Sequence, residues 1–283
     1  MDALRTAVSV MAHYDPEVQD NSPEANKRKA IRLVAQTPTV VAAFDRIRNG
    51  KEPIEATPGW GTAANLLYML TGEKPDPISE RALEVYLVLL ADHEFNASTF
   101  AARVTAATLS DMHSSVVSGI GTLKGPLHGG ANQKTMELLL EIGEPSKAPA
   151  VVEAMLARKE KIMGIGHRVY KVKDPRTTEL KKMSKIMCER IGRPELFEMS
   201  DIIEKTVWDA KKLPANVDFY SATVLHALGL STDIFTPVFA VSRMAGWTAH
   251  IMEQHANNRL IRPRAQYIGP EPGSRHYVSV EER

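Results

Sequence analysis

Cysteine is nearly absent from this chain of 283 residues, in which Cys188 is the single instance. One thiol excludes an internal disulfide framework and any cysteine-based zinc cluster, and it suits a reducing compartment. The residues around it, 185–190, have the composition of a helix. We interpret Cys188 as a packing residue rather than a nucleophile, because free cysteines are often simply buried.

The chain also lacks an excess of charge of either sign and any long apolar run. Its 35 basic and 34 acidic side chains leave a formal net charge of +1, which supplies no electrostatic footprint for DNA or RNA. No apolar run approaches the ~18–20 residues of a membrane span, and the first ten residues, MDALRTAVSV, lack the features of a secretory signal. We expect a soluble, cytoplasmic protein with no nucleic-acid or membrane partner.

Alternating β patterns are nearly absent, whereas helix caps and first-turn prolines recur at helical spacing. The sequence therefore predicts an all-α fold. Ser22 and Pro23 predict the start of one helix, and Thr37 and Pro38 predict the start of a second helix that runs to Gly50, where Asn49-Gly50 ends it. Further helices are predicted at 62–70, 78–90, 133–142, 151–161, 177–191, 194–211, 219–228 and 237–257.

Charge is distributed unevenly along the chain, and this suggests two domains. Residues 143–214 carry more Lys and Glu than either flank, so we predict that they form a small domain. Residues 1–142 and 215–283 would form a larger, more apolar domain. The stretch 101–121 is rich in Ala, Ser, Thr and Gly, which favour close helix packing, either across a subunit contact or within the chain.

Two common catalytic arrangements are missing from the sequence. His250 and His255 lie five residues apart, and neither HExxH nor another paired-ligand spacing is present, so we predict no metal site. No Gly-x-Ser-x-Gly elbow supports a Ser-His-Asp hydrolase. The candidate catalytic and binding residues lie instead in four other segments.

The first of these segments, 124–132 (KGPLHGGAN), places a histidine on a glycine-rich turn. Glycine lets a ligand approach the backbone closely. The positive end of the helix that follows biases His128 toward its neutral form, which can act as an electrophile by donating one hydrogen bond. A capping histidine in a tight turn is the alternative.

The second segment, 164–176 (GIGHRVYKVKDPR), joins a glycine turn to a histidine and several cations. Asp174 and Pro175 fit the cap and first position of the next helix. Arg176 then lies in the first turn, where its charge opposes the helix dipole and gains nothing locally, so an anionic partner is expected. A solvated basic loop is the alternative.

The last two segments place charged groups in apolar surroundings. Asp218 lies in NVDFYS, where such surroundings raise the pKa of a carboxyl group and can prepare it as a general base; an N-cap aspartate is the alternative. Arg243 lies near Phe239 and Trp247 on a predicted helix, and an arginine on an apolar face usually needs an anion. Salt bridges within the fold would also satisfy it.

Taken in order, these segments resemble citrate synthase. The resemblance runs from LRTAV at 4–8 through DHEFNAST, GPLHGGAN, GIGHRVYK with DPR, NVDFYS and FTPVFAVSRMAGWTAHIMEQ to RLIRPRAQYIGP. It implies an all-α homodimer, or a multiple of one, in which a small domain closes over the substrates. It also implies an acyltransferase of the tricarboxylic acid cycle that condenses acetyl-CoA with oxaloacetate to give citrate and CoA, without a metal or redox cofactor.

The resemblance implies three catalytic residues. Asp218 would remove the methyl proton of acetyl-CoA while His128 donates a hydrogen bond to the thioester oxygen. His167 would polarise the ketone of oxaloacetate and protonate the alkoxide. Hydrogen-bond donors that are already in place where charge develops lower the barrier of such a step.

The resemblance also implies the substrate contacts. Bidentate arginines suit carboxylates, and Arg262 would reach in from the neighbouring subunit. The oxaloacetate contacts implied in this way are His93, His167, Arg176, Arg243 and Arg262. The residues expected along CoA are Gly164, Ile165, Gly166, Arg168 and Lys171, with Arg168 and Lys171 at its phosphates.

Family members carry a substantial segment before the position of LRTAV, whereas this chain begins almost there. We expect a lack of those helices to expose apolar surface in the large domain and to weaken folding, CoA binding or dimerisation. One alternative is a 2-methylcitrate synthase that uses propionyl-CoA, since a methyl group is worth only ~1–3 kcal/mol of discrimination. The other is a non-catalytic relative that binds oxaloacetate or a partner subunit.

Overall fold

The computed structural model describes residues 1–166, 174–271, 273–274 and 277–283. Across these residues the regular structure consists of α-helices and short 3-10 turns without a β-strand, which confirms the all-α prediction. None of the described helices is long and apolar enough to cross a bilayer. The helices are α1 (Asp2–Met11), α2 (Pro23–Arg48), α3 (Thr62–Thr71), α4 (Pro77–Leu90), α5 (Ala97–Ala106), α6 (Met112–Leu123), α7 (Ala131–Ile142), α8 (Ala148–Ala157), α9 (Pro175–Arg190), α10 (Pro194–Lys211), α11 (Val217–Ala227) and α12 (Phe235–Ala256).

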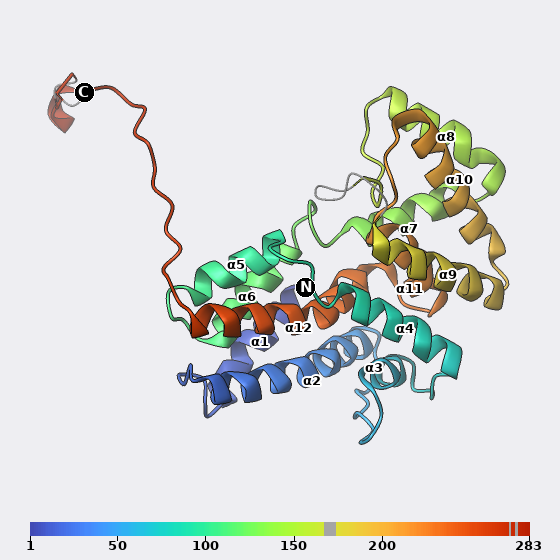
Figure 1. Ribbon diagram of the computed structural model, residues 1–283, viewed down its shortest axis with the longest axis horizontal. Helices are drawn as coiled ribbons and strands as arrows, with labels where there is room; N and C mark the ends of the chain where they lie inside the picture. Colours follow the sequence, from blue (N-terminus) through green and yellow to red (C-terminus); the bar gives the residue numbers. More distant parts are fainter. Residues whose placement is uncertain (167–173, 272, 275–276) are drawn as a thin grey trace.

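The helices form two groups (Figure 1). In one group α12 packs against α2, α4, α5 and α6, and in the other α11 packs against α7 and α9. α4 contacts α9, α11 and α12, and so joins the two groups. The segment after α12 extends away from the helices (Figure 1). The domain boundaries at 143 and 215 stay a prediction. In Figure 1, α7 and α11, which the prediction assigns to the large domain, lie beside α8–α10 of the small domain.

The prediction that a helix begins at Thr37 is wrong. α2 runs unbroken from Pro23 to Arg48 with Pro38 inside it. The Thr37 hydroxyl donates a hydrogen bond to the Leu33 carbonyl at 2.5 Å, and both Thr37 and Pro38 are buried. A proline inside a helix removes one backbone hydrogen bond, and here the packing of α2 along α12 and α3 outweighs that loss.

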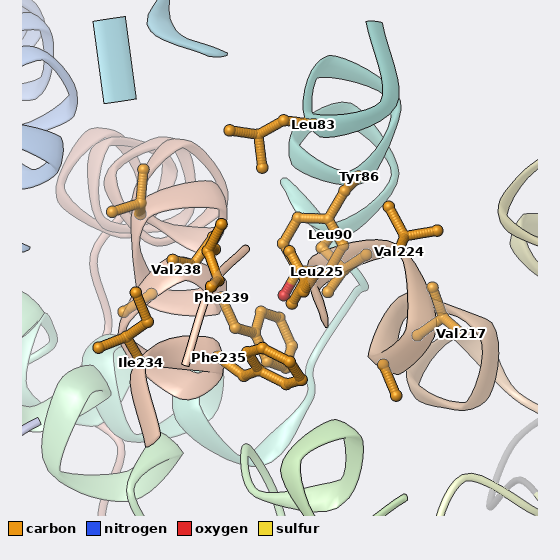
Figure 2. Packing of buried hydrophobic residues seen from close by; sticks show 14 of the residues in the cluster. Leu83, Tyr86, Leu90, Val217, Val224, Leu225, Ile234, Phe235, Val238 and Phe239 are labelled. Atoms are coloured by element: carbon orange, nitrogen blue, oxygen red, sulfur yellow. The ribbon is translucent and has the colours of Figure 1, made fainter. Parts of the chain in front are cut away.

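Helices α4, α11 and α12 meet in a common hydrophobic core (Figure 2). This core fixes the relative positions of the helices that carry Asp218 and Arg243. Cys188 lies elsewhere in the buried interior, where burial raises the pKa of its thiol to about 11, as expected of a packing residue. The core side chains labelled in Figure 2 include Leu83, Tyr86, Leu90, Val224, Leu225, Phe235, Val238 and Phe239.

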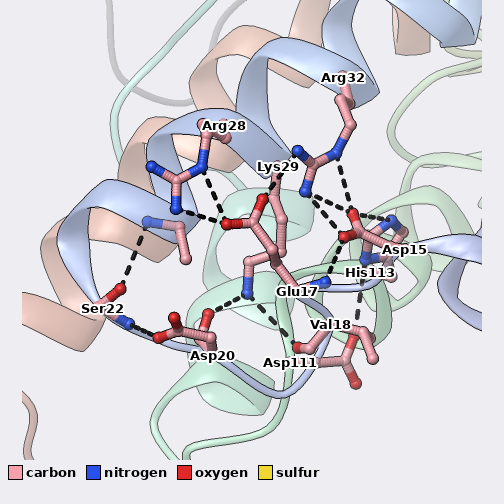
Figure 3. Close-up of polar contacts among 11 residues, drawn as sticks. Asp15, Glu17, Val18, Asp20, Ser22, Arg28, Lys29, Arg32, Asp111 and His113 are labelled. Carbon is pink, nitrogen blue, oxygen red and sulfur yellow. Dashed lines mark hydrogen bonds and ion pairs between the residues drawn. The ribbon is translucent and has the colours of Figure 1, made fainter.

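A polar cluster holds the chain before α2 against α2 and α6 (Figure 3). Lys29 of α2 is fully buried, and its ammonium donates to the Asp20 carbonyl at 2.6 Å. Arg32 binds both carboxylate oxygens of Asp15, at 2.8 and 2.9 Å through one of its nitrogens. His113 of α6 lies 3.7 Å from the same carboxylate. Charge and hydrogen bonds therefore hold the loop against α2 and α6.

Lys29→Met tests this account of the cluster. Methionine keeps most of the buried volume but cannot donate to the loop carbonyls, so we expect the free energy of unfolding to fall by about 1–3 kcal/mol. Urea denaturation followed by circular dichroism measures the change. Lys27→Met, at an exposed position of the same helix, is the matched control and should cost less than about 0.5 kcal/mol. Equal losses in the two variants would contradict the assignment.

Candidate active site

A cavity of about 580 Å³ lies between the two helix groups. Gly164 and Ile165 adjoin it without lining it, and Arg262 lies in the extended segment after α12, away from the lining. His167, Arg168 and Lys171 lie outside the described residues. The predicted residues that line the cavity together are His93, His128, Gly166, Arg176, Asp218 and Arg243.

Asn216 connects the glycine turn to the start of α11. Its side-chain oxygen accepts the Asp218 N–H at 2.9 Å, while its side-chain amide donates to the Gly166 carbonyl at 2.8 Å. Gly164 has a φ of +77°, and a Cβ there would lie 2.9 Å from the Cα of Phe219. Glycine is therefore required for the turn to reach α11.

Asp218 is the second residue of α11, and Asn216 is the cap, so the N-cap alternative for Asp218 is wrong. Among the described residues, Asp218 Oδ1 is buried without a hydrogen-bond partner. Burial raises the pKa of Asp218 to about 6, against the opposing charges of Arg176 and Arg243. The expected rise in the pKa of Asp218 is confirmed, and this carboxyl group has the properties of a general base.

His128 precedes α7, and its ring is held by the start of α5. The backbone N–H of Ser98 donates to His128 Nε2 at 3.3 Å. The Ser98 hydroxyl lies 2.9 Å from the same nitrogen, but it donates its own hydrogen to Asn96 at 2.8 Å and accepts the indole N–H of Trp247 at 3.1 Å. Nε2 is therefore the acceptor nitrogen, and a neutral ring carries its proton on Nδ1.

Burial, with a smaller contribution from the charge of Arg243, lowers the pKa of His128 to about 4. The neutral form predicted from the sequence is thus confirmed, although burial rather than the helix dipole is the main cause. The neighbouring Gly129 serves packing, because a Cβ there would lie 2.4 Å from the Leu123 carbonyl oxygen. The hydroxyl of Thr236 donates to the Gly129 carbonyl at 3.0 Å, so this glycine is needed for chain contact rather than for ligand approach.

Arg176 has a local partner that the sequence argument missed. As predicted, Asp174 caps α9 and Pro175 follows it. The Arg176 guanidinium then binds both oxygens of Asp174, at 3.1 and 2.9 Å. The expectation that the charge of Arg176 gains nothing locally is therefore wrong. The guanidinium still lines the cavity, held in place by that carboxylate.

Arg243 is buried within α12 with only part of its hydrogen-bonding capacity used. Its Nε donates to the Leu90 carbonyl at 2.8 Å, and its guanidinium lies 4.9 Å from the ring centre of Phe239. Nη1 is buried and has no hydrogen-bond partner in the described part of the chain. Burial lowers the pKa of Arg243 to about 10, so the group stays charged at neutral pH and is suited to an anion.

Sequence reasoning missed Asn96, Ser98 and Trp247. The spacing of Asn96 before a helix is a capping signal, and its side chain does accept the Thr99 N–H at 3.1 Å. No local signal connects Ser98 with His128, thirty residues later, because the contact arises only when the start of α5 meets the turn between α6 and α7 in the fold. Within the described ranges, no group of three or more His, Cys, Asp or Glu side chains forms a candidate metal site.

A sequence model described as "Citrate synthase, C-terminal domain" matches residues 1–264. The chain belongs to the citrate synthase family. It is 56% identical over 283 residues to Citrate synthase 2 of Bacillus subtilis, and the match covers all of this chain and 76% of that relative. It is 45% identical to the citrate/2-methylcitrate synthase of the same organism, over 95% of this chain and 73% of that relative.

Solved structures agree with the family assignment. A citrate synthase from Thermoplasma acidophilum, in a ternary complex with carboxymethyl coenzyme A and oxaloacetate, has a TM-score of 0.90 and 31% sequence identity to this chain. The match covers 99% of this chain and 75% of that one. The resemblance in the motifs is thus confirmed, and this member of the citrate synthase family is an acyltransferase-type enzyme with the family's all-α fold.

Asp218→Asn should stabilise the fold of this citrate synthase family member at neutral pH. The pKa of Asp218 in the folded state is raised to about 6 from the ordinary value of 3.8, so ionisation of this carboxyl group costs more free energy in the folded protein than in the unfolded chain. The resulting cost is absent below about pH 4 and complete above pH 6. We expect the variant to gain about 1–3 kcal/mol at pH 8.

Denaturant unfolding at pH 4 and pH 8 measures this difference. Asp209→Asn, at an exposed position of α10, is the matched control and should change little at either pH. A gain of the same size at both pH values would contradict the raised pKa of Asp218.

Proposed function

We propose that this enzyme condenses acetyl-CoA with oxaloacetate and hydrolyses the product to citrate and free CoA. The observation that carries the proposal is the pair formed by Asp218 and His128, which line one cavity as a carboxyl group of raised pKa and a neutral imidazole. The Thermoplasma acidophilum relative, solved with oxaloacetate and a CoA analogue, supports the same two substrates here.

Asp218 would remove a proton from the methyl group of acetyl-CoA. With a pKa of about 6, most of the carboxyl group is ionised at pH 7 to 8, and it is a stronger base than an exposed aspartate. Its unpartnered Oδ1 is the atom that would take the proton. The acetyl group then becomes an enol or enolate, and its former methyl carbon is the attacking atom.

His128 would stabilise the thioester oxygen of that enol or enolate. The Ser98 N–H occupies Nε2, so Nδ1–H is left as the donor. Because the pKa of His128 is about 4, the ring donates a hydrogen bond as a neutral group. A donor in position before charge develops lowers the barrier without reorganisation.

Oxaloacetate would bind between the two arginines of the cavity. Arg243 supports one carboxylate through its unpartnered Nη1, and Arg176 supports the other from α9. His93, on the segment between α4 and α5, completes this part of the lining. His167 would polarise the ketone and protonate the alkoxide, and Arg262 would come from a neighbouring subunit. The exposed place of Arg262 on the extended segment supports a homodimer.

CoA would lie along the glycine turn. Gly166 is part of the cavity lining, and Gly164 and Ile165 lead to it. The backbone of this turn is tied to 214–216 by the Gly166 N–H, which donates to Pro214 at 2.7 Å. Arg168 and Lys171, which follow the turn in the sequence, would contact the phosphates. The proposed reaction requires no metal or redox cofactor.

The decisive experiment measures release of free CoA thiol by the purified 283-residue chain. We expect release with acetyl-CoA and oxaloacetate together and none when oxaloacetate is left out. Asp218→Asn should abolish release while oxaloacetate still binds in calorimetry, because the base acts on the other substrate. Arg243→Ala should instead lose oxaloacetate affinity. No release by the folded wild-type chain would overturn the proposal.

A 2-methylcitrate synthase is the second candidate, favoured by the 45% identity to a citrate/2-methylcitrate synthase. The same assay with propionyl-CoA decides between the two. Because one methyl group changes binding in an apolar pocket by only ~1–3 kcal/mol, we expect kcat/KM to favour acetyl-CoA by roughly tenfold or more. A preference for propionyl-CoA would reverse the assignment.

The pH profile of kcat/KM for acetyl-CoA provides an independent test of the base. Activity needs ionised Asp218, so the profile should rise with pH, reach half its plateau near the pKa of about 6, and stay level to pH 8. His128 adds no fall in that range because it is neutral above its pKa of about 4. A half-maximum near pH 4 would show that Asp218 titrates as an ordinary carboxyl group.

A further inference from the structure

His250 of α12 lies outside the cavity lining, yet it contacts the segment that carries His93. That segment runs from the end of α4 at Leu90 to the start of α5 at Ala97, and Glu94 within it has a left-handed φ of +50°. A short turn with such a residue stays in place only when its surroundings hold it.

His250 contacts this turn on both sides of His93. Its Nε2 lies 3.2 Å from a carboxylate oxygen of Asp92, and its ring lies edge to face with Phe95, with centres 5.5 Å apart. His250 is largely buried, with a side-chain exposure of 15%. The two contacts therefore bracket His93 from the same side chain.

Arg103 of α5 decides which nitrogen of His250 carries the proton. Its Nη1 lies 3.1 Å from His250 Nδ1, and a guanidinium can only donate, so Nδ1 is the acceptor. The proton of the neutral ring is then on Nε2, the nitrogen that lies 3.2 Å from a carboxylate oxygen of Asp92. The Arg103 guanidinium also lies 4.9 Å from the ring centre of Phe95 and binds Gln254 and Glu253. His250 is thus oriented by a fixed neighbour.

The rest of the turn is anchored separately from α12. The Gly246 N–H donates to the Ala91 carbonyl at 3.0 Å, and there is no room for a Cβ at Gly246 because it would lie 2.4 Å from that oxygen. Trp247 holds Ser98, and through it His128. Within the turn, the Asn96 side-chain amide donates to the His93 carbonyl at 3.1 Å. From α12, His250 contacts Asp92 and Phe95, the residues just before and two after His93.

We propose that His250 is a positioning residue for oxaloacetate, which acts through the contact of its Nε2–H with the Asp92 carboxylate and so holds His93 at the cavity wall. The proposal rests on the proposed function, in which His93 contacts oxaloacetate. The proposal predicts an effect on oxaloacetate but not on acetyl-CoA. Acetyl-CoA would react at Asp218 and His128, and these two side chains are held by Asn216 and Ser98 rather than by His250.

Two substitutions distinguish the roles of the two ring nitrogens of His250. The amide nitrogen of glutamine reaches about as far as Nε2, so His250→Gln keeps a donor for Asp92. The amide oxygen of asparagine lies near the place of Nδ1, so His250→Asn keeps the contact with Arg103 and loses the one with Asp92. We expect the asparagine variant to raise KM for oxaloacetate roughly three- to tenfold and to leave KM for acetyl-CoA within about twofold.

The glutamine variant should keep KM for oxaloacetate within about twofold of the wild type. Equal effects of the two variants, or equal shifts for the two substrates, would overturn the proposal, because a merely structural role predicts both. Thermal unfolding of each variant shows whether the fold is kept. Asp92→Ala, at a half-exposed side chain, should reproduce the asparagine variant, and adding His250→Asn to it should cause no further rise.

Calorimetry with oxaloacetate separates this proposal from the proposed function. If the wild type binds oxaloacetate but releases no thiol, the proposed reaction fails while the ratio of Kd values between wild type and His250→Asn still tests the positioning role. A ratio of roughly three to ten would support it. A ratio near one would overturn it even if turnover is normal.

Discussion

The site depends on one buried carboxylate, that of Asp174. It caps α9, binds the Arg176 guanidinium and accepts the Val217 N–H at 3.2 Å. Burial alone would raise the pKa of Asp174, but Arg176 and the backbone N–H groups lower it, so the carboxylate stays ionised. A single charged group therefore ties the starts of two helices together and brings Arg176 beside Asp218.

Asp174 and Asp218 have different roles because their surroundings differ. Asp174 has donors on its oxygens and a lowered pKa, whereas Asp218 has an unpartnered Oδ1 and a raised one. Unpaired buried groups destabilise a fold, and Arg243 Nη1 adds a second one. The apolar core shared by α4, α11 and α12 (Figure 2) offsets that cost, and both unpaired atoms are left available to a ligand.

Local signals in the sequence predicted those parts of the site that depend on neighbouring residues. Asp174 and Pro175 begin α9 as a cap and first-turn proline should, and the apolar neighbours of Asp218 indicated its raised pKa. The same kind of signal failed at Thr37 and Pro38, where packing of α2 along α12 and α3 keeps the helix continuous. A cap is a local preference, and the packing of a long helix can outweigh it.

The sequence by itself determined the all-α class, most helix starts and the set of motifs that place the chain in its family, because these depend on residues close together in the chain. Only the tertiary structure decided that Ser98 makes Nε2 of His128 an acceptor, that Asp174 accepts the Val217 N–H, and that Arg243 keeps a nitrogen unpaired. Those properties depend on burial and on hydrogen-bond partners supplied by other helices. Both are set only when segments distant in the sequence come into contact.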